Sequence, residues 1–394
     1  MSVQKVSKMM IGSLSSSKLT GALPAVDGSA LLNVPSFIKN ASDPATDSNP
    51  SSGLGTVWVN TTSGEMFSLT DATTDENVWT NIGSGSGDVE PATAFGGNGG
   101  GRISGFNSGG YAPSGPSTQN VIEKFSLTTD ADATDVGDLP NAREQSAGQS
   151  SLTHGYNSGG HVSHNDILKF AFATNGNATD IANLTQGRGH NAGCSSSSHG
   201  YTIGGSTTGG PSAETTIDKF TFSADADATD VGDMTVGVIH GSSSSSLTHG
   251  YMAGGHTGNY TARVPSPIMK VTFSADANAT SVGDLTIPVS SVNGGQSSNT
   301  HGYSSGGDST GPGMTDSIQK YSFSTDGNST DVANITAARC QTAGQSSITH
   351  GYVSGGTSPL SNVIEKFTFA SDADATDVGD LTVTSRYGMA GHQY

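Results

Sequence analysis

Cysteine, positive charge and long apolar stretches are all scarce in this sequence, and each scarcity argues against a class of protein. Only two cysteines occur, Cys194 and Cys340, so a disulfide framework is not what holds the fold together. Lys and Arg number 16 against 34 Asp and Glu, and the net charge of −18 argues against binding to nucleic acid or to anionic lipid. No apolar run approaches the length of a transmembrane helix, so we expect no membrane insertion. Lys5 and Lys8 are not followed by a long apolar stretch, so we expect no Sec signal peptide.

Hydrophobic residues are also few, whereas glycine is abundant. Hydrophobic residues make up 32% of the chain and charged residues 13%, while glycine alone contributes 55 residues. A disordered chain can have such a composition, but its apolar residues do not return at regular positions. Here they return at a fixed period. We therefore interpret glycine and serine as turn residues and small strand residues, and we expect an all-β fold with almost no helix.

A Gly-Gly pair recurs at intervals of 45 to 52 residues and defines a repeat of about 50 residues. The glycines of these pairs are Gly109, Gly110, Gly159, Gly160, Gly204, Gly205, Gly254, Gly255, Gly306, Gly307, Gly355 and Gly356. Five pairs follow a His-Gly-Tyr sequence, and the first copy has Ser104-Gly105-Phe106 instead. A chain that leaves a strand beside its neighbour turns sharply, often at positive φ, which glycine adopts without steric cost. We therefore predict a structural role for these pairs.

Each repeat predicts four short strands separated by tight turns. An alternating run such as residues 122–127 is followed by an Asp-rich turn, by a short run such as residues 136–139, and by small residues such as 142–151. A sheet of four short strands cannot bury both of its faces alone, whereas sheets stacked around an axis can. The sequence therefore predicts a six-bladed β-propeller over residues 92–394. We expect six residues or their immediate neighbours to pack between the sheets: Phe125, Phe170, Phe220, Phe273, Phe323 and Phe367.

The repeat resembles the kelch repeat of β-propellers. The resemblance rests on the repeat length and on a Gly-Gly pair that closes the second strand, as in Tyr156-Asn157-Ser158-Gly159-Gly160. The tryptophan that usually marks the fourth kelch strand is replaced by residues 136–139, so we describe the repeat as kelch-like. Residues 386–393 resemble residues 143–149, which precede a His-Gly-Tyr strand. We therefore expect the C-terminal segment to complete the first blade, with residues 92–101 as the alternative.

Residues 1–90 lack the repeat and divide into three predicted parts. These are an N-terminal segment at 1–35, a small β module at 36–83 and a Gly/Ser linker at 84–91. Both tryptophans, Trp58 and Trp79, lie in the module and are predicted to form its core. Val57 and Val59, a Thr-Ser-Gly turn and Met66-Phe67 predict a hairpin, with Val78-Trp79 as a third strand.

Two segments of this region resemble parts of tail fibres and related virion proteins of tailed bacteriophages. They are residues 18–32, and residues 55–67 together with 77–83. The resemblance implies a non-enzymatic virion structural protein, a tail fibre or fibre-like appendage. Residues 1–35 would anchor it to the virion, and residues 1–90 would bind other virion proteins or form a homotrimer. The propeller loops would engage a glycan or receptor on the host surface. The first alternative is a bacterial cell-surface adhesin or lectin, and the second is a propeller-fold glycosidase or oxidase.

The Asp-rich turns are the candidate metal sites. Three copies have the alternating carboxylate spacing that Ca²⁺ sites use, at Asp130, Asp132, Asp135, Asp225, Asp227, Asp230, Asp372, Asp374 and Asp377. Other copies have Asn or Gly, and no bidentate Glu follows, so a turn stabilised by Asp and Asn side chains is the competing interpretation. The histidine of His-Gly-Tyr has two similar interpretations, a metal-binding ring or packing between blades with a bond to a neighbouring backbone. We predict no catalytic constellation and no cofactor other than this calcium alternative.

Overall fold

The computed structural model describes residues 37–82, 102–113, 117–161, 164–208, 212–257, 266–291, 294–309, 313–383 and 385–393. The chain separates into two compact units, Met1–Val89 and Glu90–Tyr394, which are described here one at a time. The predicted N-terminal segment 1–35, the linker 84–91 and the alternative closing segment 92–101 lie outside the described residues.

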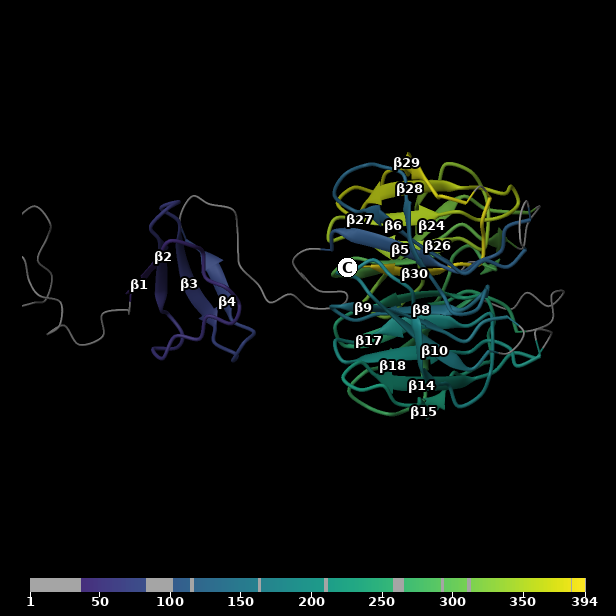
Figure 1. Ribbon diagram of the computed structural model, residues 1–394, viewed down its shortest axis with the longest axis horizontal. Helices are drawn as coiled ribbons and strands as arrows, with labels where there is room; N and C mark the ends of the chain where they lie inside the picture. Colours follow the sequence, from purple (N-terminus) through teal and green to yellow (C-terminus); the bar gives the residue numbers. More distant parts are fainter. Residues whose placement is uncertain are drawn as a thin grey trace, which may run out of the picture. The chain divides into compact units, whose positions relative to one another are not determined.

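The described part of the first unit forms one four-stranded sheet (Figure 1). Its strands are β1 (Phe37–Asn40), β2 (Val57–Asn60), β3 (Met66–Asp71) and β4 (Val78–Asn81), in that order. The β2–β3 hairpin and β4 are antiparallel as predicted, whereas β1, which the sequence did not reveal, pairs with β2 in parallel. The rings of Trp58 and Trp79 meet edge to face with centroids 5.7 Å apart, and Phe67 and Leu69 complete this core.

The described part of the second unit forms six four-stranded antiparallel sheets, numbered here along the chain. Sheet 1 contains β30 (Ala390–Gln393), β5 (Ser104–Ser108), β6 (Val121–Ser126) and β7 (Thr134–Asp138). Sheet 2 contains β8 (Ala147–Ser150), β9 (His154–Ser158), β10 (Asp166–Ala171) and β11 (Thr179–Asn183). Sheet 3 contains β12 (Ala192–Ser195), β13 (His199–Ile203), β14 (Thr216–Thr221) and β15 (Thr229–Asp233).

The other three sheets have the same order of strands. Sheet 4 contains β16 (Ser242–Ser245), β17 (His249–Ala253), β18 (Pro267–Thr272) and β19 (Thr280–Asp284). Sheet 5 contains β21 (Gly295–Ser297), β22 (His301–Ser305), β24 (Ser317–Ser322) and β25 (Thr330–Asn334), and beside it β20 (Val289–Ser290) pairs with β23 (Asp308–Ser309). Sheet 6 contains β26 (Ala343–Ser346), β27 (His350–Ser354), β28 (Val363–Thr368) and β29 (Thr376–Asp380).

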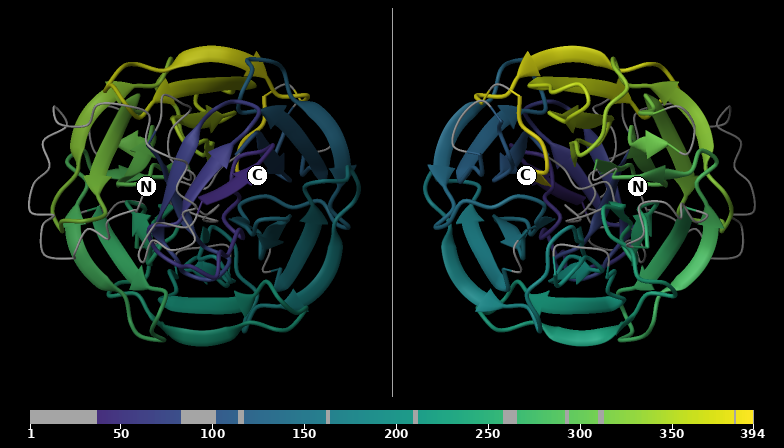
Figure 2. Two further views of the ribbon diagram at one scale, coloured as in Figure 1. Left: turned by 90° about the vertical axis from the view of Figure 1, so that its left-hand side faces the viewer. Right: turned by 90° about the vertical axis from the view of Figure 1, so that its right-hand side faces the viewer.

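The six sheets lie around a common centre, with their first strands innermost (Figure 2). The first strands contact one another in chain order, from β8 through β12, β16, β21 and β26 to β30, and β30 also contacts β8. Strand β30 pairs antiparallel with β5, from Ala390 opposite Ser108 to Gln393 opposite Gly105. The C-terminal segment therefore completes the first sheet, as predicted. In each sheet, one turn joins the third strand to the fourth, and in sheets 2 to 6 another joins the first to the second; both lie at the same end, which we call the turn end. The Gly-Gly loop joins the second strand to the third at the opposite end, which we call the loop end.

Aromatic residues fill the space between neighbouring sheets. Tyr156 of sheet 2 stacks on Phe222 of sheet 3 at a centroid distance of 4.8 Å and also contacts Phe220 at 5.5 Å. The glycine between His and Tyr leaves room for the third strand's ring, because a Cβ on Gly155 would lie 2.3 Å from Phe170 Cζ. The prediction that the six phenylalanines pack between sheets is confirmed.

The predicted set of phenylalanines nevertheless mixes two positions of the repeat. Phe273 and Phe323 follow the third strand and correspond to Phe222, whereas the position of Phe220 is occupied in those sheets by Val271 and Tyr321. Both positions are aromatic in most copies, so the sequence pattern alone did not separate them.

Buried ion pairs anchor the connections between sheets. Arg188, which lies between β11 and β12, pairs with Asp218 of β14 at 2.9 Å, and both side chains are fully buried. Asp218 also accepts hydrogen bonds from the backbone N–H of Thr185 at 3.1 Å and from its hydroxyl at 2.7 Å. Three further pairs recur at related places: Arg143 with Asp166, Arg339 with Glu365, and Arg386 with Glu123.

Sheet 4 replaces both members of this pair with apolar residues. The carbonyl oxygen of Val238 accepts the N–H of Gly205, just as that of Arg188 accepts the N–H of Gly160. Met269 occupies the position in β18 that Asp218 occupies in β14. Both charges are therefore missing together, so no buried charge is left without a partner.

Candidate functional site

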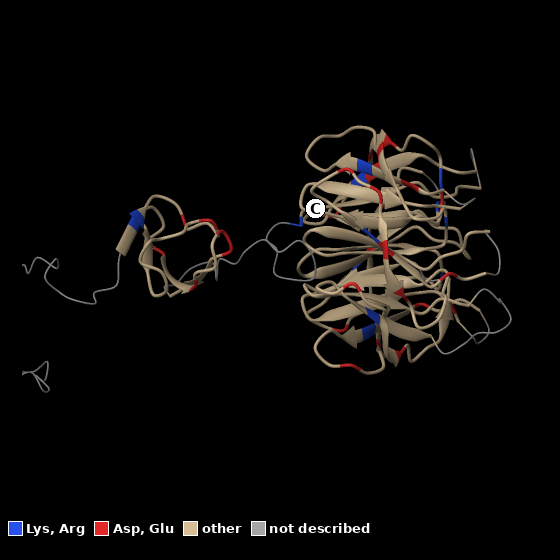
Figure 3. Cartoon of the chain, turned by 90° about the horizontal axis from the view of Figure 1, so that it is seen from below, with Lys and Arg blue, Asp and Glu red and all other residues tan. Residues whose placement is uncertain are grey.

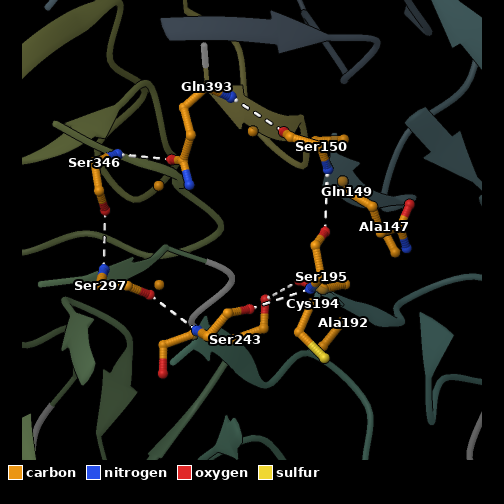
Figure 4. Close-up of a pocket in the computed structure, with 18 of the residues that line it drawn as sticks. Ala147, Gln149, Ser150, Ala192, Cys194, Ser195, Ser243, Ser297, Ser346 and Gln393 are labelled. Carbon is orange, nitrogen blue, oxygen red and sulfur yellow. Dashed lines mark hydrogen bonds between the residues drawn. The ribbon is translucent and has the colours of Figure 1, made fainter. Parts of the chain in front are cut away.

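The first strands of all six sheets line a pocket at the centre of the second unit, which we call the axial pocket (Figure 4). Its cavity volume is ≈ 80 Å³. A buried water needs roughly 10–15 Å³ measured in this way, so the axial pocket has room for several water molecules or for one small polyatomic ligand.

A closed circle of hydrogen bonds surrounds the axial pocket near the turn end. In each sheet, the backbone N–H of one residue donates to the side-chain oxygen of the equivalent residue in the next sheet. The distances are 3.1 Å for Ser150 to Ser195, 3.1 Å for Ser195 to Ser245, 2.9 Å for Ser245 to Ser297, 2.9 Å for Ser297 to Ser346, 2.8 Å for Ser346 to Gln393 and 3.2 Å for Gln393 to Ser150. We call these six residues the serine ring; dashed lines in Figure 4 mark several of its bonds.

A layer of glycines lies two residues before the serine ring. A Cβ on Gly148 would lie 2.3 Å from the carbonyl oxygen of Gly391, and one on Gly295 would lie 1.9 Å from that of Ser243. Real Cβ atoms do not approach oxygen so closely, so the first strands can meet here only without side chains. Ser243 is the exception in this layer, and its hydroxyl donates to the carbonyl oxygen of Gly193 at 2.7 Å.

Arg102 is the one charged residue among the described residues that line the axial pocket. It lies just before β5, at the turn end. Burial lowers the pKa of Arg102 to about 10, and the guanidinium therefore remains protonated at neutral pH. No Asp or Glu lines the axial pocket in the described part of the chain, although the protein as a whole carries a net charge of −18.

The Gly-Gly pairs at the loop end adopt the predicted conformation. All twelve glycines have positive φ, as in Gly109 at 65° and Gly110 at 108°. A Cβ on Gly109 would also lie 2.5 Å from the carbonyl oxygen of Arg143, which accepts the N–H of Gly110 at 2.7 Å. The pair therefore lets each second strand end directly against the connection that leads from the same sheet to the next one.

Six residues that the sequence did not single out occupy equivalent positions at the loop end, and backbone hydrogen bonds link them in series. Each has φ between 53° and 65°: Gln145, His190, His240, Ser291, Gln341 and Gly388. Their backbones bond from one sheet to the next, as in His190 N–H to Gln145 O at 2.8 Å and His240 N–H to His190 O at 2.9 Å. Only one of the six is glycine. The conformation is imposed by these long-range bonds and leaves no common residue type in the sequence.

Four histidines, two of which belong to this set, form a chain at the loop end. His161 Nδ1 lies 3.2 Å from His190 Nε2, the rings of His190 and His240 stack at 4.3 Å, and His256 follows His240 at 5.6 Å. Burial, together with His161 and His256, lowers the pKa of His190 to about 4, and burial lowers that of His240 well below its usual range. The imidazoles of His190 and His240 are therefore neutral at physiological pH.

The recurring histidines of His-Gly-Tyr occupy a different place, at the turn end of each second strand. His154 Nδ1 lies 2.8 Å from the hydroxyl oxygen of Thr153, and the other four histidines bond the preceding Ser or Thr in the same way. The hydrogen-bond partner of each imidazole is thus the preceding hydroxyl group and not the neighbouring backbone group that the packing interpretation expects.

The Asp-rich turns link each sheet to the preceding one. Their first carboxylate pairs with a lysine of the preceding sheet, as Asp130 does with Lys366 at 2.6 Å and Asp372 with Lys320 at 3.0 Å. Asp225 pairs with Lys169 in the same way. Charged residues are sparse along the sheets (Figure 3).

The second and third aspartates of these turns bond to backbone N–H groups. Asp132, Asp227 and Asp374 accept from the end of the preceding sheet's fourth strand, at 3.0, 2.8 and 2.9 Å. Asn177 accepts the equivalent N–H of Asp138 at 3.0 Å, so an amide oxygen serves as well as a carboxylate. Asp135, Asp230 and Asp377 accept from the glycine two residues later.

These bonds explain the exchange between Asp and Asn without a metal ion. In the described part of the chain, no group of three or more His, Cys, Asp or Glu side chains is placed to hold a metal ion. The geometry therefore gives the calcium interpretation no support, and the turn interpretation accounts for the spacing.

Comparison with known proteins assigns no family to the chain. No protein-family model matches the sequence, and no curated protein matches it significantly. Within the described residues, no helix has the length and hydrophobicity needed to cross a lipid bilayer.

Proposed function

We propose that the second unit is a six-bladed, kelch-like β-propeller. Six equivalent four-stranded sheets and the contact of β30 with both β26 and β8 support this proposal. Sheets 6 and 1 are also joined by the ion pair of Lys366 with Asp130 and by the hydrogen bond from the Tyr352 hydroxyl to the Leu127 carbonyl oxygen at 2.8 Å. Averaged electron micrographs of the protein would test the proposal. Six similar lobes are expected, and an open arc would contradict it.

We further propose that the protein is a non-enzymatic virion structural protein of a tailed bacteriophage, a tail fibre or fibre-like appendage. The observation that carries this proposal is the separation of two kinds of sequence. The segments that resemble virion proteins all lie before Val89, and the repeats all lie after Glu90, where the chain divides into two compact units. In this proposal, residues 1–90 bind other virion proteins and the propeller loops contact the host surface.

The loop end supports a role in recognition. The stretch after each Gly-Gly pair differs between copies in length and composition, while the strands around it repeat closely. Tyr111 and Tyr387 form an aromatic pair there, with centroids 5.2 Å apart, and both rings are partly exposed. Variable loops on a rigid scaffold are the usual place for binding residues.

Mass spectrometry of purified phage particles tests the location, and competition tests the polarity. The chain is expected in the particles, and purified protein is expected to reduce phage adsorption to host cells. Antibodies against a loop-end peptide should block adsorption, whereas antibodies against residues 37–82 should not. Absence from particles would contradict the proposal and favour the bacterial adhesin.

A further inference from the structure

Two buried histidines at the loop end have ring nitrogens without hydrogen-bond partners. His190 is 6% exposed and His240 is 4% exposed, and their rings stack at a centroid distance of 4.3 Å. Within the described part of the chain, Nδ1 of His190 and both ring nitrogens of His240 form no hydrogen bond. A buried nitrogen without a partner loses the hydrogen bond that it makes in water, so other contacts must hold the two rings in place.

Backbone hydrogen bonds from neighbouring sheets provide these contacts. The N–H of His190 donates to the carbonyl oxygen of Gln145 at 2.8 Å, and the N–H of His240 donates to the carbonyl oxygen of His190 at 2.9 Å. Both histidines have positive φ, at 59° and 61°. Residues other than glycine rarely adopt this conformation, so the buried arrangement depends on these long-range bonds.

The residues directly before the two histidines anchor the Gly-Gly loops of sheets 3 and 4. Gly189 and Ser206 exchange backbone hydrogen bonds of 3.0 and 2.8 Å, and Ile239 and His256 exchange two of 3.0 Å. Ser206 and His256 each follow the Gly-Gly pair of their sheet directly. A movement of either buried histidine would therefore also release the start of a loop.

Two further histidines flank the stacked pair. His161 Nδ1 lies 3.2 Å from Nε2 of His190, and the ring of His256 lies 5.6 Å from that of His240. The four imidazoles form one row, and a proton on one of them disfavours a proton on its neighbour.

No carboxylate among the described residues offsets a proton on the stacked pair. Glu144 interacts electrostatically with the first histidine of the row and Asp308 with the last, and neither acts on the two rings between them. Arg188, the charged residue nearest in sequence to the stacked pair, has its own counter-charge in Asp218 at 2.9 Å.

A proton on either stacked ring is therefore unfavourable in the buried arrangement. Burial, together with the neighbouring histidines, lowers the pKa of His190 to about 4 and that of His240 well below its usual value of 6.5. An imidazole that reaches solvent has its ordinary pKa again. The buried arrangement is consequently most stable above pH 6.5, and this stability is lost as the pH falls from 6.5 toward 4.

From this geometry we propose that His190 and His240 form an acid-sensitive switch that controls the loops of sheets 3 and 4. Protonation moves the two rings into solvent, breaks the backbone bonds of Gly189 and Ile239, and frees the starts of both loops. The proposal concerns the second unit alone and does not depend on the location of the protein in a virion.

Hydrogen exchange of the full chain, measured by mass spectrometry at pH 7.5 and pH 5.5, tests the switch without any mutation. Rates are divided by those of an unstructured reference peptide at the same pH, so that only the opening of the protein is compared. One imidazole with a pKa of 6.5 when open and about 4 when buried raises the open population about tenfold at pH 5.5.

We expect at least this increase in exchange over residues 186–206 and 236–256. The equivalent residues of sheets 2 and 6, 141–161 and 337–357, have glutamine in place of the buried histidine and should change much less. An equal change in all four segments, or no change in any of them, would overturn the proposal.

The double variant His190→Gln with His240→Gln tests whether these two imidazoles are the titrating groups. Gln145 and Gln341 occupy the equivalent positions with φ of 55°, so glutamine suits this backbone conformation. We expect exchange at pH 7.5 like that of the unmodified chain and no additional opening at pH 5.5. Acid-induced opening that persists in the double variant would overturn the proposal.

His392→Gln is the matched control. It removes another buried imidazole, on β30, and should leave the acid-induced opening of sheets 3 and 4 unchanged. If the double variant does not fold, His240→Gln alone takes its place and should reduce the acid-induced increase at least about threefold. An increase equal to that of the unmodified chain would then count against the switch.

Discussion

Replacing the buried pair of Arg188 and Asp218 by valine and methionine should leave the second unit nearly as stable as before. Either single replacement leaves one fully buried charge without its partner, because both side chains have no exposed surface. Removing one partner of a buried ion pair typically costs about 3–5 kcal/mol, so Arg188→Val and Asp218→Met should each lower the free energy of unfolding by that amount. The double variant copies Val238 and Met269 of sheet 4 and should lie within about 1 kcal/mol of the unmodified protein.

The assay is guanidinium denaturation followed by circular dichroism. Both tryptophans lie in the first unit, so tryptophan fluorescence would not report on the second. The reverse exchange in sheet 4, Val238→Arg with Met269→Asp, provides the matched control and should also change stability only slightly. If the two single losses simply add in the double variant, the pair contributes stability that apolar side chains cannot replace, and the reasoning is wrong.

Three further changes test other parts of the fold. The imidazole of His392 forms hydrogen bonds with Ser108 and with the carbonyl oxygen of Gln149, and burial lowers its pKa from 6.5 to about 4. The unfolded chain therefore binds this proton more readily than the folded chain, and the free energy of unfolding falls as the pH drops from 6.5 toward 4. His392→Gln, which copies Gln149 and Gln345, should remove about 3 kcal/mol of that acid-induced loss in denaturation at pH 7 and pH 4; an unchanged pH dependence would refute this. Deletion of residues 386–394 removes β30 and leaves the Glu123 carboxylate buried without Arg386. We therefore expect a lower melting temperature and reduced solubility. An unchanged melting temperature would mean that another segment fills the place of β30. Gly295→Ala places a Cβ 1.9 Å from the Ser243 carbonyl oxygen and should cost about 3 kcal/mol in chemical denaturation, whereas Gly176→Ala, which meets nothing within 4 Å, should have little effect; similar losses in both would contradict the glycine-layer argument.

The features that could be predicted from the sequence are those that restrict residue type locally. Positive φ at consecutive positions selects glycine, and Gly109-Gly110 and its copies were therefore visible. Alternating apolar residues revealed the third strands, and the resemblance of residues 386–393 to 143–149 revealed β30.

The features that escaped prediction depend on contacts between distant residues. The conformation of Gln145 and His190 is held by bonds from other sheets, and many residue types can be held in this way. The serine ring escaped because serine is common throughout the chain, and only the meeting of six strands separates Ser195 from its many neighbours. The carboxylates at Asp132 and Asp227 follow a calcium-like spacing, but their bonding partners lie in preceding sheets, which the spacing does not reveal.

The pairing of β30 with β5 can form only after the ribosome has synthesised almost the whole chain. Ser108 and His392 touch across 284 residues of sequence, and a ribosome that adds about 5–20 residues per second needs roughly 15–55 seconds to make that length. During this interval β5 has emerged but its partner has not, so its unpaired edge is open to pairing with other nascent chains. Sheets 2 to 5 can already stack on one another in that time, and β30 pairs with β5 last. We therefore expect prematurely terminated chains to be the main source of aggregates in the cell, and slower translation to prolong the interval in which a chaperone has to shield β5.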